Sequence, residues 1–225
     1  SAKGPSLEEL EAGKVAAACV RDCQLDQLIL DSKFLREDSL QELIKTLVSI
    51  RQGTEDQSSL NGHYDEDACV FFLELLVRVV LQNRDRIAPV WQAVHYHLYN
   101  IVVNISSHSF LLERAVVGLL RISIRLLRRE ENATQVLSSL RILLMMKPQV
   151  IHSISRQISF GLHDLLRTNA ANIHSSQDWY TLFTLLEVAG AGANLPPVMQ
   201  SRPDVDLSEV INDAGAQSDS EVQDA

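Results

Sequence analysis

The chain has 225 residues with 46% hydrophobic side chains, so it can bury a substantial core in one large domain or two small ones. The net charge of −9 argues against a nucleic-acid binder, and three cysteines, Cys19, Cys23 and Cys69, are too few and odd in number for a disulfide framework. Nine glycines and six prolines, among long segments rich in Leu, Ile and Val, favour helices over short strands, so we expect an all-α fold.

Capping signals predict the N-terminal helices, which form a first part over residues 1–50. Ser6 with Glu9 three residues later is a capping box, and it predicts a helix to about residue 22 with a shorter piece through residue 30. Ser39 with Glu42 repeats this pattern ahead of an apolar stripe that ends before residue 53.

A polar segment separates this part from the core. Residues 51–64 are polar and contain glycine, which predicts a flexible loop. The core, residues 65–190, should hold further helices whose starts carry an N-cap residue or a first-turn proline: Asp65, Pro89, Ser109, Asn132, Pro148, and Ser175 with Asp178. We expect these helices to end near residues 83, 103, 131, 146, 169 and 190.

Helix starts near residues 65, 108 and 149 repeat at intervals of about 41 to 43 residues, inside the range of HEAT and armadillo repeats. A stack of helical hairpins is therefore the preferred architecture, with an irregular helical bundle as the alternative.

After this core the composition changes. Residues 191–225 are dense in Asp, Ser and Gln and bury too little apolar surface to offset the entropy of ordering, so we expect a disordered acidic tail. Ser218 has an acid three residues later, the pattern that an acidophilic kinase recognises. Ser218 and Ser220 are therefore candidate phosphorylation sites, where a phosphate would add about −1.5 to −2 charges.

The distribution of charge makes the middle of the chain basic. Residues 1–68 carry 7 Lys/Arg and 14 Asp/Glu, residues 109–170 carry 9 and 4, and residues 200–225 carry 1 and 7. This pattern suits either an ordinary solvated surface or a basic face for an anionic partner.

An arginine stripe lies in this basic region, on the helix expected between residues 113 and 131. On a helical wheel four arginines fall within an arc of about 60° and apolar residues cover most of the rest, so the helix should be sandwiched in the middle of the stack. The stripe is a candidate contact for anionic lipid or a partner: Arg114, Arg121, Arg125 and Arg128. The alternative is a solvated edge, or internal pairing with Glu74, Glu113 or Asp164.

No residue pattern indicates catalysis, a cofactor or a metal. The close pair His95 and His97 points about 200° apart around a helix, and Cys19 and Cys23 lack a second ligand pair at zinc-like spacing. Nucleotide-binding, serine-hydrolase and zinc-protease motifs are missing from the sequence. We therefore expect no enzymatic activity in this segment, and no cofactor.

The chain shows neither a signal segment nor an apolar run of the roughly 18 residues that a membrane span needs. We therefore expect a cytoplasmic protein, or one that is peripheral on a membrane.

Several long runs resemble one known family. They are NRDRI at 83–87, ERAVVGLLRISIRLLRREE at 113–131, LSSLRILLMMKP at 137–148, LLRTNAANIHS at 165–175 and DWYTLFTLLE at 178–187. They are similar to the Golgi-specific brefeldin A-resistance guanine nucleotide exchange factors, which are large activators of Arf GTPases. The likeness is dense from about Phe34 to Glu187, and DAGAQSDSE at 213–221 resembles the linker that follows. The matching region is a helical homology region downstream of the catalytic exchange domain.

The resemblance implies a regulatory segment of a protein that acts on Arf at early Golgi membranes, in coatomer-dependent retrograde traffic. The family's catalytic domain has no counterpart in these residues, so Arf would be a partner of the parent protein only. The expected partners are Golgi lipids such as phosphoinositides, Golgi-associated proteins, and neighbouring domains of the same factor. The alternative is a purely structural module for protein interaction or self-association, without lipid contact.

Overall fold

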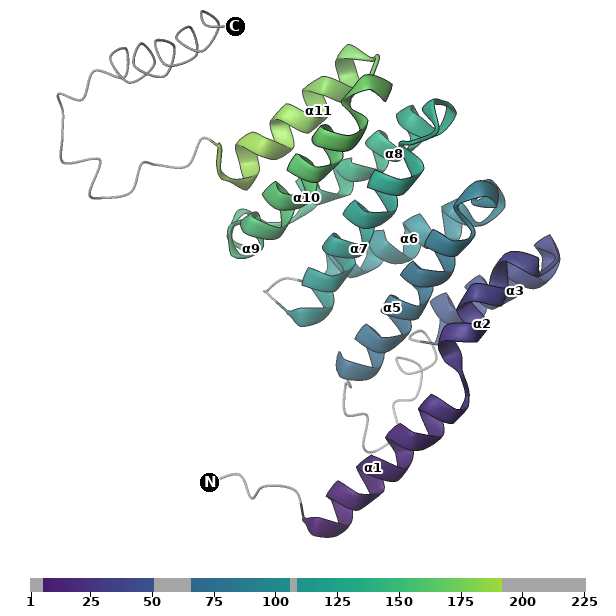
Figure 1. The fold of residues 1–225 in the computed structure, drawn as a ribbon. Coiled ribbons are helices and arrows are strands. Elements are labelled where there is room, and N and C mark those ends of the chain that lie inside the picture. The colour runs from purple at the N-terminus through teal and green to yellow at the C-terminus, as the bar shows by residue number, and fades with distance from the viewer. Residues whose placement is uncertain (1–5, 51–65, 106–108, 192–225) are drawn as a thin grey trace, which may run out of the picture. The chain divides into compact units, whose positions relative to one another are not determined.

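The computed structural model describes residues 6–50, 66–105 and 109–191, and every regular element in these ranges is helical (Figure 1). The all-α prediction is therefore confirmed for the described part of the chain. The predicted loop at 51–64 and the N-cap Asp65 lie outside the described residues, and so does all of the predicted tail at 191–225 except its first residue, including Ser218 and Ser220. The α-helices are α1 (Leu7–Asp22), α2 (Leu25–Asp31), α3 (Glu37–Ser49), α5 (Glu66–Gln82), α6 (Ala88–Asn104), α7 (Phe110–Leu126), α8 (Ala133–Ser139), α9 (Pro148–Ser153), α10 (Ser155–Asn169) and α11 (Ser176–Leu186).

The helices form a stack of hairpins, as predicted, and the stack consists of two rows. One row is α2, α5, α7 and α10, in which each helix packs against the next (Figure 1). The second row is α3, α6, α8 with the 3-10 turn Leu140–Met145 that follows it, and α11. Within this arrangement α7 contacts α5 on one flank and α10 on the other, so the expected central position of this helix is confirmed.

Several predicted helix starts are confirmed at atomic detail. The Ser6 hydroxyl accepts a hydrogen bond from the Glu9 N–H while the Glu9 carboxylate accepts one from the Ser6 N–H, which is the predicted capping box. Ser109 caps α7 by accepting from the Leu112 N–H at 3.1 Å, and Pro89 lies in the first turn of α6. Ser175 precedes α11 in an extended conformation but makes no capping hydrogen bond with its side chain.

The predicted capping box at Ser39 and Glu42 is wrong. Helix α3 begins at Glu37, after the extended residue Arg36, so Ser39 lies inside the first turn. Glu37 and Asp38 place negative charge at the positive end of the helix, which stabilises this earlier start without a side-chain cap.

Two predicted helices are broken in the structure. The segment after Asn132 is α-helical only to Ser139 and continues as a 3-10 turn, and the Asn132 side chain makes no capping hydrogen bond. The segment after Pro148 breaks at Ile154, where φ is −118° and ψ is 15°. Apolar residues are buried on both sides of each break, so the hydrophobic pattern continues although the α-helix does not.

Hydrogen bonds from polar side chains connect neighbouring helices of the first row near their C-terminal ends. The Asn83 amide donates to the Ser32 hydroxyl at 2.8 Å, which joins the end of α5 to the end of α2. The Asn169 amide donates to the Ile124 carbonyl at 3.1 Å, and the Asn172 amide donates to the Leu127 carbonyl at 2.7 Å. The bonds from Asn169 and Asn172 satisfy backbone carbonyls near the end of α7. All three bonds help to fix the register between hairpins.

Two glycines allow α7 to approach its neighbours closely. A Cβ atom on Gly118 would lie 2.8 Å from Cγ2 of Val77 on α5, and a Cβ on Gly161 of α10 would lie 2.6 Å from Cδ1 of Leu120. Both distances are too short for carbon atoms, so the packing on each flank of α7 depends on a missing side chain.

We predict that Gly118→Val lowers the free energy of unfolding by about 1–3 kcal/mol, because the added methyl groups overpack the α5–α7 contact. Urea denaturation followed by circular dichroism measures this change. Gly13→Val is the matched control, since a Cβ on Gly13 of α1 meets nothing within 4 Å. Equal stability of the two variants would show that the close approach is unimportant.

Candidate functional site

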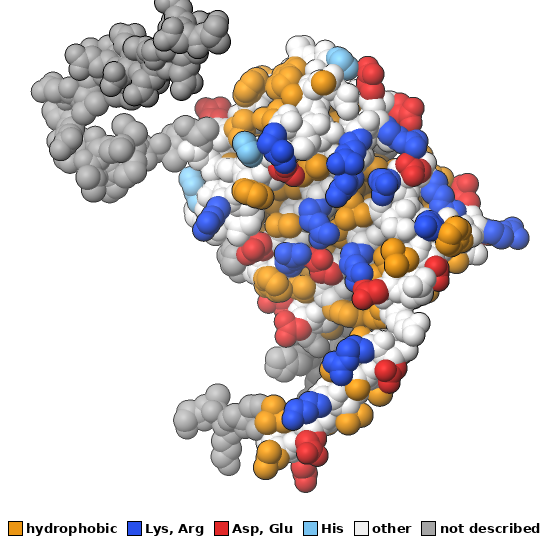
Figure 2. All heavy atoms as spheres, in the orientation of Figure 1, with side chains coloured by type: hydrophobic (Ala, Val, Ile, Leu, Met, Phe, Trp, Pro, Cys, Tyr) orange, Lys and Arg blue, Asp and Glu red, His pale blue; other side chains and the backbone are white. Residues whose placement is uncertain are grey.

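The face formed by α5, α7 and α10 carries the predicted arginine stripe. Figure 2 shows Lys and Arg side chains gathered over the middle of this face, interspersed with apolar patches. Helix α7 buries ten of its residues against its neighbours, and the arginines occupy the edge that remains. The buried residues are Leu111, Leu112, Ala115, Val116, Gly118, Leu119, Leu120, Ile122, Ser123 and Leu126. The stripe is therefore the part of α7 that packing leaves available.

The helix ends earlier than predicted, which separates Arg128 from the other three arginines. The last turn of α7 closes with the bond from the Leu127 N–H to the Ser123 carbonyl, and Arg129 is already extended. The expectation of a helix to residue 131 is therefore wrong. Burial of both Leu126 and Leu127 turns the chain inward here, and Arg129 forms an ion pair with Asp85 at 2.8 Å.

Two of the four arginines pair internally with a single acid on α5. Arg114 binds Glu74 through both Nη2 at 2.6 Å and Nε at 2.7 Å, and its side chain is only 28% exposed. Arg121 reaches the other oxygen of Glu74 at a longer 3.5 Å. Glu74 is itself largely covered, so this contact supports the α5–α7 packing and leaves Arg114 little freedom to bind anything else.

The other two arginines are exposed. Neither Arg125 nor Arg128 has an acidic partner among the residues that the structure describes, and the same holds for Arg156 on α10. Arg125 lines a hollow of about 290 Å³ together with Arg78 of α5 and Arg84 of the 3-10 turn Arg84–Arg86 that follows α5. The structure thus brings Arg125 close to arginines of another helix, which the sequence pattern on α7 alone could not indicate.

A further hollow of about 370 Å³ lies between α6 and α8 and has a different character. Its lining includes Trp91, Gln92, His95 and Gln135. Burial lowers the pKa of His95, so its ring is neutral near pH 7. This hollow therefore offers hydrogen-bonding groups without a net charge, in contrast to the arginine-bearing face.

The described residues provide neither a metal centre nor a membrane-spanning helix. No group of three His, Cys, Asp or Glu side chains in the described ranges lies close enough together to hold a metal ion. Within the same ranges, none of the helices has the length and apolar character that crossing a bilayer requires.

We predict that Arg114→Ala lowers the free energy of unfolding by about 1–2 kcal/mol, because a partly buried, charge-assisted hydrogen bond to Glu74 is lost. Arg125→Ala is the matched control on the same helix, and it should change stability by less than about 0.5 kcal/mol. Chemical denaturation of both variants measures the difference. If Arg125→Ala proved as destabilising as Arg114→Ala, the division into paired and exposed arginines would be incorrect.

Comparison with known proteins assigns the chain to a family. The chain is 42% identical over 196 residues to the Golgi-specific brefeldin A-resistance guanine nucleotide exchange factor 1 homolog of Caenorhabditis elegans, an alignment that covers 83% of this chain and 10% of that protein. It is 39% and 34% identical over 185 residues to the ARF guanine-nucleotide exchange factors GNL1 and GNOM of Arabidopsis thaliana. These alignments cover 82% of this chain, and 12% and 13% of the two relatives.

No protein-family model matches the chain, and no solved structure matches it significantly. The chain spans only about a tenth of the length of the relatives that it matches. It is homologous to one segment of these long proteins, and it belongs to the family of the large Arf guanine nucleotide exchange factors.

Proposed function

We propose that this chain is a non-catalytic helical segment of a large Arf exchange factor that acts at the early Golgi, in coatomer-dependent retrograde traffic. In this proposal the segment helps to recruit the parent protein to the membrane, or contacts Golgi-associated proteins and neighbouring domains. Arf binds the parent protein elsewhere. The names of the three relatives support exchange on Arf as the activity of the parent, and the name of the Caenorhabditis elegans relative supports the Golgi as its location.

One observation carries the proposal of a docking role. Arg125 and Arg128 are exposed at the C-terminal end of α7 and have no acidic partner in the described part of the chain. A cation in water without a partner contributes little to folding, but near an anionic membrane surface each is worth about 1 kcal/mol of binding. Arg84, beside Arg125, extends the same positive region, whereas the neighbouring Arg78 is paired with Asp26 of α2.

A second candidate function is a purely structural interaction module without lipid contact. The pairing of Arg114 and Arg121 with Glu74 favours it, because half of the stripe serves the packing of the stack. Helix α1 adds to this reading: none of its residues is buried, and Leu7 and Val15 are 82% and 63% exposed. An apolar surface of this kind suits contact with another protein segment.

Co-sedimentation with liposomes separates the two candidates. We predict that the wild-type chain pellets with vesicles that contain phosphatidylserine or a phosphoinositide. The double variant Arg125→Glu/Arg128→Glu should bind at least about thirtyfold more weakly, which corresponds to the loss of ~2 kcal/mol from two cations. Circular dichroism should show that the variant remains folded, since both side chains are exposed.

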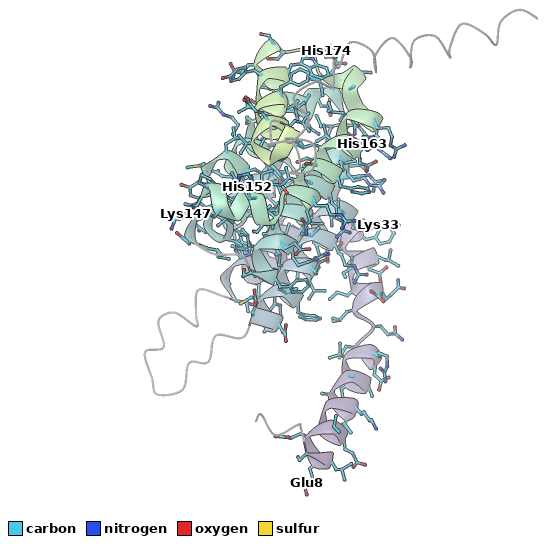
Figure 3. All side chains as sticks on the ribbon, turned by 90° about the vertical axis from the view of Figure 1, so that its left-hand side faces the viewer. Glu8, Lys33, Lys147, His152, His163 and His174 are labelled. Carbon is cyan, nitrogen blue, oxygen red and sulfur yellow. The ribbon has the colours of Figure 1, made fainter. Side chains whose placement is uncertain are left out.

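The matched control is Arg141→Glu/Lys147→Glu, which makes the same change in charge. Lys147 lies on the opposite side of the stack from His163 of α10 (Figure 3), so this control tests whether position matters in addition to net charge. Equal loss of binding in both double variants would indicate a non-specific charge effect. Failure of the wild type to bind any vesicle would favour the structural module.

A further inference from the structure

A second feature of the same face is an apolar groove between α7 and α10. Its volume is about 540 Å³, and it is open to solvent along one side. Val117, Leu120 and Ile124 of α7 line it from one helix, and Phe160 of α10 lines it from the other. The Phe160 side chain is 75% exposed, so a large aromatic surface stands at the edge of the groove without a covering residue in the described part of the chain.

The charged side chains at this groove are predominantly positive. Arg121 and Arg156 both line it. Arg156 has no acidic partner among the described residues, and Arg121 holds only the long contact to Glu74 at 3.5 Å. The one acid in the lining, Asp164, is already bound by Arg167 at 2.7 Å. A ligand that enters the groove therefore meets uncompensated guanidinium groups, which select for negative charge.

A buried amide at the groove lacks a hydrogen-bond partner among the described residues. Gln157 lines the groove, and its Oε1 atom is buried with no hydrogen-bond partner in the described part of the chain. A buried acceptor left unpaired costs free energy, and only a donor can satisfy it after the amide turns toward the ligand. The side-chain amide, hydroxyl and indole groups of a protein segment can donate this hydrogen bond.

The shape of the groove also favours a protein segment over a bilayer. The apolar lining is recessed between two adjacent helices, and side chains that project from a partner helix can enter such a recess. A helix laid along α7 and α10 would direct apolar residues at i, i+3 or i+4, and i+7 toward Ile124 and Phe160. Acidic residues on its flanks would reach Arg121 and Arg156.

We propose that the groove between α7 and α10 binds an acidic amphipathic helix of a partner protein. This inference rests on the proposed function, because it names the partner class for one part of the arginine-bearing face. The apolar residues of the partner helix contact Phe160 and the groove floor, its carboxylates pair with Arg121 and Arg156, and one of its donors satisfies Gln157.

The test is selection from a display library of helical peptides of about four turns on the immobilised 225-residue chain, followed by fluorescence anisotropy with the enriched peptides. We expect the enriched peptides to be amphipathic and acidic. Arg156→Glu and Phe160→Ala should each weaken their binding at least about tenfold, because each removes a central contact of the interface. Both side chains are exposed, so the variants should fold like the wild type.

Matched controls exist for both variants. Arg141→Glu makes the same change in charge on another exposed arginine, and Tyr180→Ala removes an aromatic ring of α11 that is 68% exposed. Neither control should change the dissociation constant by more than about twofold. Enriched peptides that bind all four variants equally would overturn the proposal, and so would an absence of enriched peptides.

The same four variants tested on vesicles of phosphatidylcholine and phosphatidylserine separate this inference from the proposed function. If no peptide is enriched, but the wild-type chain binds the vesicles and Arg156→Glu abolishes this binding, the face contacts lipid and the partner helix is excluded. If neither peptides nor vesicles bind, the inference and the docking role both fail.

Discussion

The burial of α7 on two flanks is the constraint on which the rest of the structure depends. Ten of its residues are buried, and glycine permits the close approach on each flank, at Gly118 toward α5 and at Gly161 of α10. A helix held this way has only a narrow edge left for polar residues. Arginine suits that edge because its aliphatic part can lie over apolar neighbours while the guanidinium reaches water or an acid. The packing of the stack thus determines which edge of α7 is left for the arginines.

The same packing divides the arginines into two groups with different roles. Arg114 and Arg121 lie opposite Glu74 of α5 and are drawn into a contact between hairpins, whereas Arg125 and Arg128 lie past the reach of that acid and stay exposed. On the other flank of α7, Arg156 adds an exposed cation beside an apolar groove. Internal pairing and external docking are therefore compatible on one face, because successive turns of the helix meet different neighbours.

Local sequence signals predicted the class of fold and several helix starts, because a cap such as Ser6 with Glu9, or Ser109, acts within one turn. They did not predict helix ends correctly where two local signals compete, or where no local signal is present. Ser39 resembled a cap, but the acids before it favour an earlier start, and no glycine or proline marks the end of α7 at Leu126. Glu74 was one of three acids expected to pair with the arginines if the stripe is structural, and Arg114 and Arg121 do contact it. Spacing along the chain could not select Glu74 or place Arg156 nearby, because the two lie 40 and 42 residues from Arg114 and are placed beside α7 only by the repeat. The apolar groove was missed for the same reason, since its two walls come from different hairpins.

In the proposed function, the chain is one segment of a long exchange factor whose catalysis takes place elsewhere. The most direct test uses the intact parent protein with Arg125→Glu and Arg128→Glu, and measures nucleotide exchange on Arf in solution together with the fraction of the protein bound to Golgi membranes in cells. The account predicts an unchanged exchange rate in solution and a clearly reduced membrane-bound fraction. A reduced exchange rate in solution, with membrane binding intact, would contradict a non-catalytic docking role for this segment.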